Sequence, residues 1–288
     1  MKHKHQKNGF RNTVILCLMI YFAIFLVYPL YKAMVGSFYD WNPLVNRYNF
    51  VGLENYEFVL TDKLFWKSLS NTMLFTFVAT FFRVIIGLGL ALLIYSKFTK
   101  FRTFFQAVFY VPTVTPLVAV SFVWMWMFNP QFGLVNKILQ VDINWLKDSK
   151  WAMVAVILMT IWKDFGYSTV LFLAGLMGLP LEVYEASRMD GANGLQTFKN
   201  ITIPLLQPVT IFVILTSLIS YFQSYIQFLV MTEGGPGTST FVLSYLIFDE
   251  AFVNYNFGTA SAIAVILFMI ISVLSVVMFR VTYRKEQQ

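Results

Sequence analysis

Two hydrophobic stretches of this chain carry polar side chains that recur with the period of an α-helix. Such groups are costly inside a bilayer and usually face a bundle interior or a water-filled cavity. Residues three and four positions apart share one helix face. Together with their aromatic rings they suit a hydroxyl-rich sugar, so we expect them to line a sugar path: Thr160, Lys163, Asp164 and Tyr167 in the first stretch, Ser217, Ser220, Tyr221, Ser224 and Gln227 in the second.

A second interpretation of these residues stays open, because Ser, Thr and Tyr often hydrogen-bond across packed membrane helices. Lys163 and Asp164 are adjacent, so on a helix their side chains diverge by about 100° and do not form a simple helix-face pair. One could meet the substrate while the other pairs elsewhere. Arg83, in the middle of another hydrophobic stretch, is an alternative partner. We expect Arg83 to pack inward against a carboxylate or backbone carbonyls. A further hypothesis is that Lys163 binds an acidic sugar.

The sequence offers no site for catalysis or metal binding. The single cysteine, Cys17, lies in an apolar run, so neither a disulfide framework nor a thiolate site is indicated. His3 and His5 stand in a basic tail. The glycine-rich turn at 234–237 lacks the lysine and hydroxyl residue of a phosphate-binding loop and follows no strand. We therefore expect no catalytic residue, no metal and no cofactor bound by this chain.

The elements that position these residues are membrane spans. Of 288 residues, 58% are hydrophobic and 12% charged, whereas soluble domains carry about 25% charged residues. Apolar runs long enough to cross a core of about 30 Å predict six helices. The sequence thus indicates an all-α polytopic membrane protein, with a basic tail at 1–12, one transmembrane domain at 13–285, and spans at about 13–35, 70–95, 104–128, 151–177, 209–231 and 257–279.

The basic residues predict the orientation of these spans. The formal charge of +7 fits the positive-inside bias better than nucleic-acid binding. With both termini in the cytoplasm, 12 Lys and Arg residues lie inside and 6 lie in external loops. The external segments are then 37–69, 129–150 and 232–256, and residues 240–256 are expected to include a short interfacial helix.

The polar loop at 179–208, between the fourth and fifth spans, is the most distinctive stretch. Pro180 suits a helix start, and Glu182 and Glu185 follow where the helix dipole favours negative charge. Asp190-Gly191 and Asn193-Gly194 are turn signals. The loop therefore predicts a short helix, a turn and a second short helix at the membrane surface, where a soluble partner docks.

Several residues of this loop resemble the EAA loop of binding-protein-dependent ABC importer permeases: Glu185-Ala186-Ser187, Asp190-Gly191-Ala192, Phe198, Ile201 and Pro204. Ser187 replaces the usual second alanine. FVGLENY at 50–56, Asn71-Thr72 and TEGGPGTST at 232–240 look like the carbohydrate-uptake class, which includes the maltose-transporter permeases. The resemblance implies the type I ABC importer permease fold, with a cytoplasmic coupling helix in a cleft of the ATPase. The implied coupling residues are Tyr184, Glu185, Ala186, Ser187, Met189, Asp190, Gly191 and Ala192.

The resemblance further implies one permease subunit of an ATP-driven importer of a di- or oligosaccharide, in a bacterial cytoplasmic membrane. Its partners would be a second homologous permease, two ATP-binding subunits that hold ATP and Mg, and an external sugar-binding protein, with no nucleic acid. The chain would be a transporter subunit, not an enzyme. One alternative is a permease of the same family for a non-sugar solute. Another is a secondary transporter or channel, a class that often shows internal repeats, and no repeat is evident in this sequence.

Overall fold

The computed structural model describes residues 2–96 and 99–286, and only the backbone of residues 2–10 and 281–286. The topology expectation placed on Lys97 lies outside the described residues. Contacts divide the chain into two compact units. The first contains the residues up to Lys63 and Leu246–Phe268, and the second contains Leu64–Tyr245 and the residues from Met269 on. The single transmembrane domain stays a prediction.

The first unit begins with one long helix built from α1 (Lys2–Phe22), a π-helical turn η1 (Ala23–Val27) and α2 (Tyr28–Gly36). The segment Arg11–Gly36 is long and apolar enough to cross a membrane. None of the most apolar part of this segment is buried within the structure. An apolar helix of this length can be covered by lipid or by other membrane helices.

A small β-hairpin follows, which the sequence analysis did not predict. Strand β1 (Tyr39–Asn42) pairs antiparallel with β2 (Arg47–Phe50) around a 3₁₀ turn, η2 (Pro43–Val45). Asn42 accepts a hydrogen bond from the Leu44 backbone, and Asn46 closes the turn in the left-handed region. Tyr39 stacks on Tyr48 with ring centroids 4.3 Å apart. Helix α3 (Glu54–Thr61) completes this segment.

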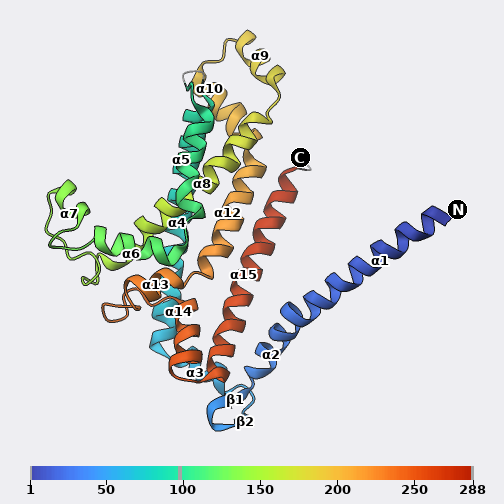
Figure 1. Ribbon diagram of the computed structural model, residues 1–288. Helices are drawn as coiled ribbons and strands as arrows, with labels where there is room; N and C mark the ends of the chain where they lie inside the picture. The colour runs from blue at the N-terminus through green and yellow to red at the C-terminus, as the bar shows by residue number, and fades with distance from the viewer. Residues whose placement is uncertain (1, 97–98, 287–288) are drawn as a thin grey trace. The chain divides into compact units, whose positions relative to one another are not determined.

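The second unit holds the helices that carry the predicted site (Figure 1). Its long elements are α4 (Lys63–Tyr95, from Leu64 on), α5 (Arg102–Val114), α6 (Leu117–Met127), α8 (Ala152–Met177) and α12 (Gln207–Phe222). Shorter helices are α7 (Leu134–Leu139) and α13 (Ile226–Met231). Helix α14 (Leu243–Phe248), the π-helical turn η4 (Asp249–Val253) and α15 (Phe257–Glu286) close the chain.

The number of membrane-length helices depends on how two bent pairs are counted. In the described part of the chain, four helices are long and apolar enough to cross a membrane, and there are six if each bent pair forms one span. The six predicted spans agree only with the second count. The predicted third span is broken between α5 and α6, which meet at 95°. Pro116 explains the break, because it lacks an N–H and disfavours the helical conformation of Thr115, which is extended at ψ 137°.

The second bent pair joins the segment Gly194–Leu205 to α12 at 61°, just before the predicted fifth span. The fifth span itself is interrupted further on, so the expected continuous polar face is wrong. Helix α12 ends at Phe222, and α13 begins only at Ile226. The Phe222 carbonyl, which would continue the helix ladder, accepts a hydrogen bond from the Ser244 hydroxyl at 2.7 Å. Ser224 therefore lies between two helices and Gln227 on the second of them, not on the face of α12.

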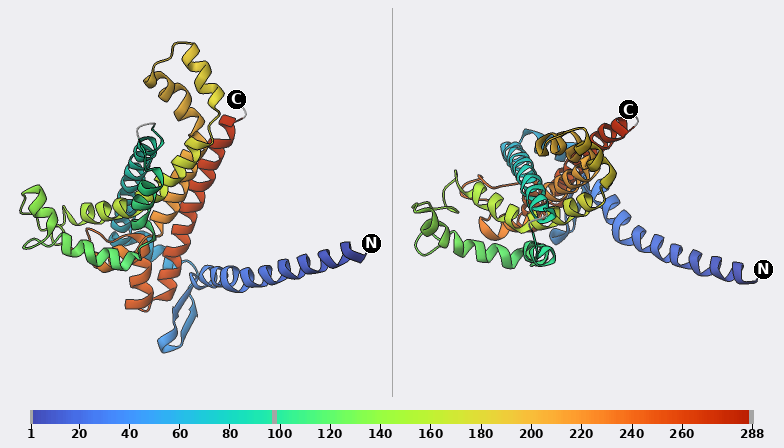
Figure 2. Two further views of the ribbon diagram at one scale, coloured as in Figure 1. Left: turned by 45° about the horizontal axis from the view of Figure 1, so that its top comes forward. Right: turned by 90° about the horizontal axis from the view of Figure 1, so that it is seen from above.

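Close helix approaches hold the second unit together. Helix α5 packs along α8 (Figures 1 and 2), and a Cβ added at Gly166 of α8 would collide with the backbone carbonyl of Phe109. Helix α4 meets α8 at Gly87, where an added Cβ would lie 2.7 Å from the Ser168 Cβ. Glycine at both positions allows the helix axes to approach closely.

Candidate functional site

The loop at 179–208 forms the predicted helix, turn and second helix. Helix α9 (Leu181–Met189) starts after Pro180, and the chain turns at Gly191, whose φ is +75°. Asn193 caps α10 (Gly194–Thr197) in a capping box with Gln196. A π-helical turn, η3 (Phe198–Thr202), and α11 (Ile203–Leu205) lead into α12. Figure 1 shows α9 and α10 together at one end of the second unit, away from α13.

One hydrogen bond ties α9 to another segment, and a second lies within the helix. The Tyr184 hydroxyl lies 3.0 Å from Thr202 Oγ1, which ties α9 to the returning chain. The buried Ser187 donates to the Tyr184 carbonyl at 2.9 Å. Tyr184 and Ser187 therefore face inward, and Ala192 is half-buried. The remaining predicted coupling residues are exposed: Glu185, Ala186, Met189, Asp190 and Gly191.

The exposed side of this loop is apolar as well as charged. Met189 is 89% exposed, Leu195 76% and Leu181 69%. Beneath it, a buried cluster joins α4, α8 and the start of α12: Ala91, Ile94, Phe172, Leu173, Leu176, Leu206 and Val213. A Cβ added at Gly175 would lie 2.9 Å from Val209 and 3.0 Å from Leu206. The loop thus rests on close-packed side chains, which transmit displacement rather than absorb it.

On α8, the predicted substrate residues have distinct partners. Thr160 is buried and donates to the Val156 carbonyl of its own helix at 2.8 Å. Lys163 donates from Nζ to the Thr113 carbonyl at 3.1 Å, close to the α5–α6 break. The same Nζ lies 3.7 Å from Asp164 Oδ1, so the two neighbours form an ion pair although they do not share a helix face. The flexible four-carbon lysine stem explains the pair, because it bends back toward both acceptors.

Arg83 of α4 packs inward, as expected, but its partner is not a carboxylate. Its Nε donates to the Ser168 hydroxyl at 3.4 Å, and that hydroxyl donates to the Arg83 carbonyl at 3.3 Å. The guanidinium carbon lies 5.3 Å from the ring centre of Tyr167 and 5.5 Å from that of Tyr221. Arg83 is only 6% exposed. Among the described residues no acidic side chain forms an ion pair with it.

On α12 and α13, the predicted residues divide into buried and accessible ones. Ser217 is buried and donates to the Val213 carbonyl at 2.6 Å. Tyr221 is buried and has no hydrogen-bond partner in good geometry, although the charges of Asp164 and Arg83 both act on its hydroxyl. Gln227 is buried with its Oε1 unpartnered. Ser220 is exposed and Ser224 half-buried.

The structure thus gathers part of the predicted set around Arg83. Tyr167 and Tyr221 contact it, and the pair of Lys163 and Asp164 lies on the same helix as Tyr167. We name Arg83, Lys163, Asp164, Tyr167 and Tyr221 the intramembrane cluster. Thr160 and Ser217 have their hydroxyls bonded within their own helices. That all nine residues line a path stays a prediction.

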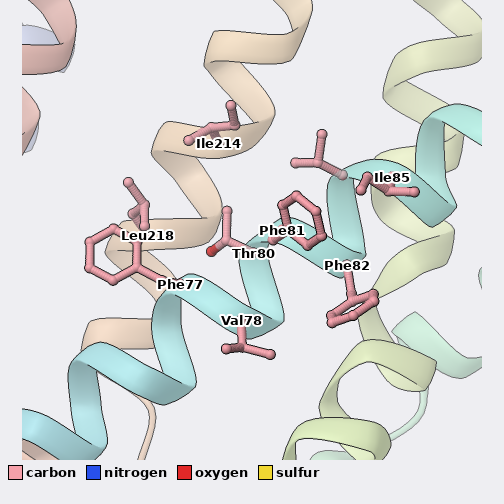
Figure 3. A pocket seen from close by; sticks show the side chains of 9 residues that line it. Phe77, Val78, Thr80, Phe81, Phe82, Ile85, Ile214 and Leu218 are labelled. Carbon is pink, nitrogen blue, oxygen red and sulfur yellow. The ribbon is translucent and has the colours of Figure 1, made fainter.

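The hollow between α4 and α12 does not have the chemistry of a sugar site. It has a volume of about 570 Å³ and is lined by Phe77, Val78, Thr80, Phe81, Phe82, Val84, Ile85, Ile214 and Leu218. Figure 3 shows Thr80 as the one labelled side chain with an oxygen among apolar ones. A sugar needs many hydrogen-bonding groups, whereas this surface suits an acyl chain or a packed helix. Among the described residues, no group of three or more His, Cys, Asp or Glu could hold a metal ion.

The glycine-rich turn after α13 is attached to α4 by contacts that the sequence alone did not assign. Asn71 donates through Nδ2 to the carbonyls of Thr238 at 2.9 Å and Phe241 at 2.8 Å. Thr72 Oγ1 accepts from the Leu243 backbone at 2.8 Å. The resemblance of Asn71-Thr72 to the family marked these two residues in the sequence. It did not identify their partners, which lie about 170 positions further along the chain.

Several membrane-length helices, with a polar helix–turn–helix between two of them, define a multi-pass membrane protein. Comparison with known proteins gives the particular family. Residues 83–286 match the family described as binding-protein-dependent transport system inner membrane component, and the chain belongs to this family. Its members are transporter subunits and not enzymes, as the sequence predicted.

Relatives match over nearly the whole chain. The trehalose/maltose transport system permease protein of Thermococcus litoralis is 32% identical and covers 98% of this chain and 95% of its own. The sn-glycerol-3-phosphate transport system permease protein of Agrobacterium fabrum is 33% identical and covers 90% and 89%. A crystal structure of a bacterial ABC transporter for the acidic polysaccharide alginate aligns with a TM-score of 0.82 at 20% identity, covering 97% of this chain and 96% of that chain. The predicted type I importer permease fold is thereby confirmed.

Proposed function

We propose that this chain is one permease subunit of an ATP-driven importer of a di- or oligosaccharide. The observation that carries the proposal is the geometry of α9. Its inward side buries Ser187 and is tied to the returning chain by Tyr184, while Glu185 and Met189 remain exposed for a soluble partner. A coupling element must contact its partner differently in two states, and a short helix held by its own hydrogen bonds can do so as a rigid body.

The mechanism follows from what lies beneath α9. ATP binding closes a pair of ATPase subunits, which hold the ATP and Mg and which displace α9. The close-packed contacts of Gly175 with Leu206 and Val209 pass this displacement into α8 and α12. The path bounded by these helices then alternates between its outward-open and inward-open states.

The chain supplies half of such a path. A second, homologous permease supplies the other half, and an external sugar-binding protein delivers the substrate. The bias of basic residues supports a cytoplasmic location for both termini and α9, in a bacterial cytoplasmic membrane.

A sugar is the proposed substrate because the predicted path offers hydroxyls and rings. The relatives support a hydroxyl-bearing solute: one is named for trehalose and maltose, and one for sn-glycerol-3-phosphate. Because of the relative named for sn-glycerol-3-phosphate, a non-sugar solute remains the alternative. For the path itself we propose Thr160, Lys163, Asp164, Tyr167, Ser217, Ser220, Tyr221, Ser224 and Gln227 as the lining set.

Co-purification tests the proposal. The chain is expressed with its genomic neighbours, captured by a tag, and assayed for ATP hydrolysis stimulated by sugar and binding protein. We expect an ATPase and a second permease to co-purify, and Glu185→Ala to uncouple hydrolysis from sugar. Glu182→Ala is the matched control, since Glu182 is an exposed glutamate on the same helix. A chain that purifies alone, or equal effects of the two variants, would contradict the assignment.

A further inference from the structure

We infer that Arg83 is a substrate-binding residue and that the imported solute carries an acidic group: a carboxylate, sulfonate or phosphate on a sugar-sized body. The inference rests on the proposed function and adds the charge of the substrate. It also moves the charge-selective role from Lys163, where the sequence placed it, to Arg83.

The charges of the intramembrane cluster do not balance. In α4 from Ser70 on, in α8 and in α12, the described residues that carry charge are Arg83, Lys163 and Asp164. Lys163 and Asp164 form an ion pair at 3.7 Å, which leaves one positive charge. Ionisable groups at membrane depth commonly pair with each other or mark a solute path. Arg83 has no such pair among the described residues.

Lys163 is not the cation that remains free to bind an acidic solute. Its Nζ already donates to the Thr113 carbonyl at 3.1 Å, beside the α5–α6 break. Thr113 in turn donates through Oγ1 to the Lys163 carbonyl at 3.0 Å, so the two residues bind each other reciprocally. This arrangement satisfies a carbonyl freed by a broken membrane helix. Lys163 is therefore part of the scaffold.

The guanidinium of Arg83 has unused donors. Arginine carries five N–H groups in a rigid planar fork that matches an oxyanion. Only Nε has an acceptor in good geometry among the described residues, the Ser168 hydroxyl at 3.4 Å. The rings of Tyr167 and Tyr221, at 5.3 and 5.5 Å from the guanidinium carbon, stabilise the cation but accept no conventional hydrogen bond.

Neighbouring groups complete a site for an acidic sugar. The Tyr221 hydroxyl is buried without a hydrogen-bond partner in good geometry, within reach of the charges of Arg83 and Asp164, and can donate to an anion. Tyr167 is half-buried and presents a ring on which a sugar C–H face can pack. The Lys163–Asp164 pair lies on the same helix as Tyr167 and adds a carboxylate, which can accept a hydrogen bond from a sugar hydroxyl. An oxyanion bound by the fork of Arg83 would neutralise the cluster, and such charge-assisted pairs are shorter and stronger than neutral ones.

The test uses the complete transporter with its binding protein in lipid nanodiscs. The probes are a disaccharide that ends in a uronic acid and its neutral counterpart, in which a hydroxymethyl group replaces the carboxyl. We expect the binding protein to bind the acidic probe and the probe to stimulate ATP hydrolysis. Arg83→Gln should raise the KM for the acidic probe by about tenfold or more, and Arg83→Lys, which keeps the charge, should restore much of the loss.

Ser168→Ala is the matched control, because it removes the hydrogen bond to Nε and leaves the charge in place. It should change KM for the acidic probe far less than Arg83→Gln does. Three outcomes overturn the inference. The first is stimulation by the neutral probe alone, and the second is an unchanged KM in Arg83→Gln. The third is loss of the second permease on purification of Arg83→Gln, which would assign the counter-charge to that subunit. If neither probe nor any other sugar stimulates hydrolysis, the proposed sugar import fails instead.

Discussion

Gly166 and Gly89 are predicted to respond oppositely to the same substitution. Both lie inside long helices, α8 and α4. A Cβ at Gly166 would collide with the Phe109 carbonyl oxygen and lie 2.8 Å from its carbon and 3.1 Å from Tyr110 Cα. A Cβ at Gly89 would have no heavy atom within 4 Å. Comparing alanine substitutions at these two positions separates the effect of helix propensity, which is the same at both, from the effect of packing, which differs.

The expected magnitudes follow from these contacts. In a helix interior, Gly→Ala gains about 0.5–1 kcal/mol of stability. Gly89→Ala should show this gain in full. At Gly166 the added Cβ meets the backbone of α5, which cannot rotate away as a side chain can, so α5 and α8 must separate. The destabilisation caused by overpacking, about 1–3 kcal/mol, should therefore lie near its upper limit. We therefore expect a net loss of about 2 kcal/mol for Gly166→Ala.

The assay is thermal unfolding of each purified variant in one detergent, with both variants measured beside the unmodified protein. For a chain of this size, about 1 kcal/mol corresponds to a shift of roughly 2–4 °C. Gly89→Ala should raise the apparent midpoint slightly, and Gly166→Ala should lower it by roughly 4–8 °C. Equal shifts of the same sign in the two variants would refute the close approach of α5 to α8.

Three further substitutions test single contacts. Lys163→Met leaves the Thr113 carbonyl without its donor, so we expect the free energy of unfolding to fall by about 1–3 kcal/mol. Transport of neutral and acidic solutes should fall equally, and a selective loss for acidic solutes would contradict the scaffold role. Asn71→Ala removes two buried hydrogen bonds to the glycine-rich turn, and hydrogen exchange at 232–243 should accelerate; unchanged protection would refute the attachment. Tyr184→Phe breaks the bond to Thr202 and should weaken sugar-stimulated relative to basal ATP hydrolysis; an unaltered ratio would show that α9 is fixed by other means.

Much of the fold could be predicted because its signals are local. An apolar run long enough to cross a bilayer shows in the sequence regardless of what it packs against. The loop around α9 is equally local: Pro180 precedes the helix, Gly191 has φ +75°, and Asn193 caps α10. Each of these residues has a backbone preference that acts within a few positions, so the helix–turn–helix was visible before any tertiary contact was known.

What the sequence missed depends on distant partners. The end of α12 is stabilised by a hydrogen bond from Ser244 to the Phe222 carbonyl. No local sequence pattern indicates this contact, so the sequence predicted a continuous fifth span. The pair of Lys163 and Asp164 forms only because Lys163 bends toward Thr113 of another helix. Periodicity places side chains on a face but does not say which hydroxyls bond to their own backbone, as Thr160 and Ser217 do.

The central claim is that this permease imports its solute only when ATPase subunits act on α9. The most direct measurement is uptake of labelled solute by liposomes that contain the whole complex, with the binding protein and solute on one side and ATP on the other. We predict accumulation that requires ATP and is abolished by Glu185→Ala, with Glu182→Ala close to the unmodified protein. Uptake by the chain alone, without ATP, would contradict the account and favour a secondary transporter.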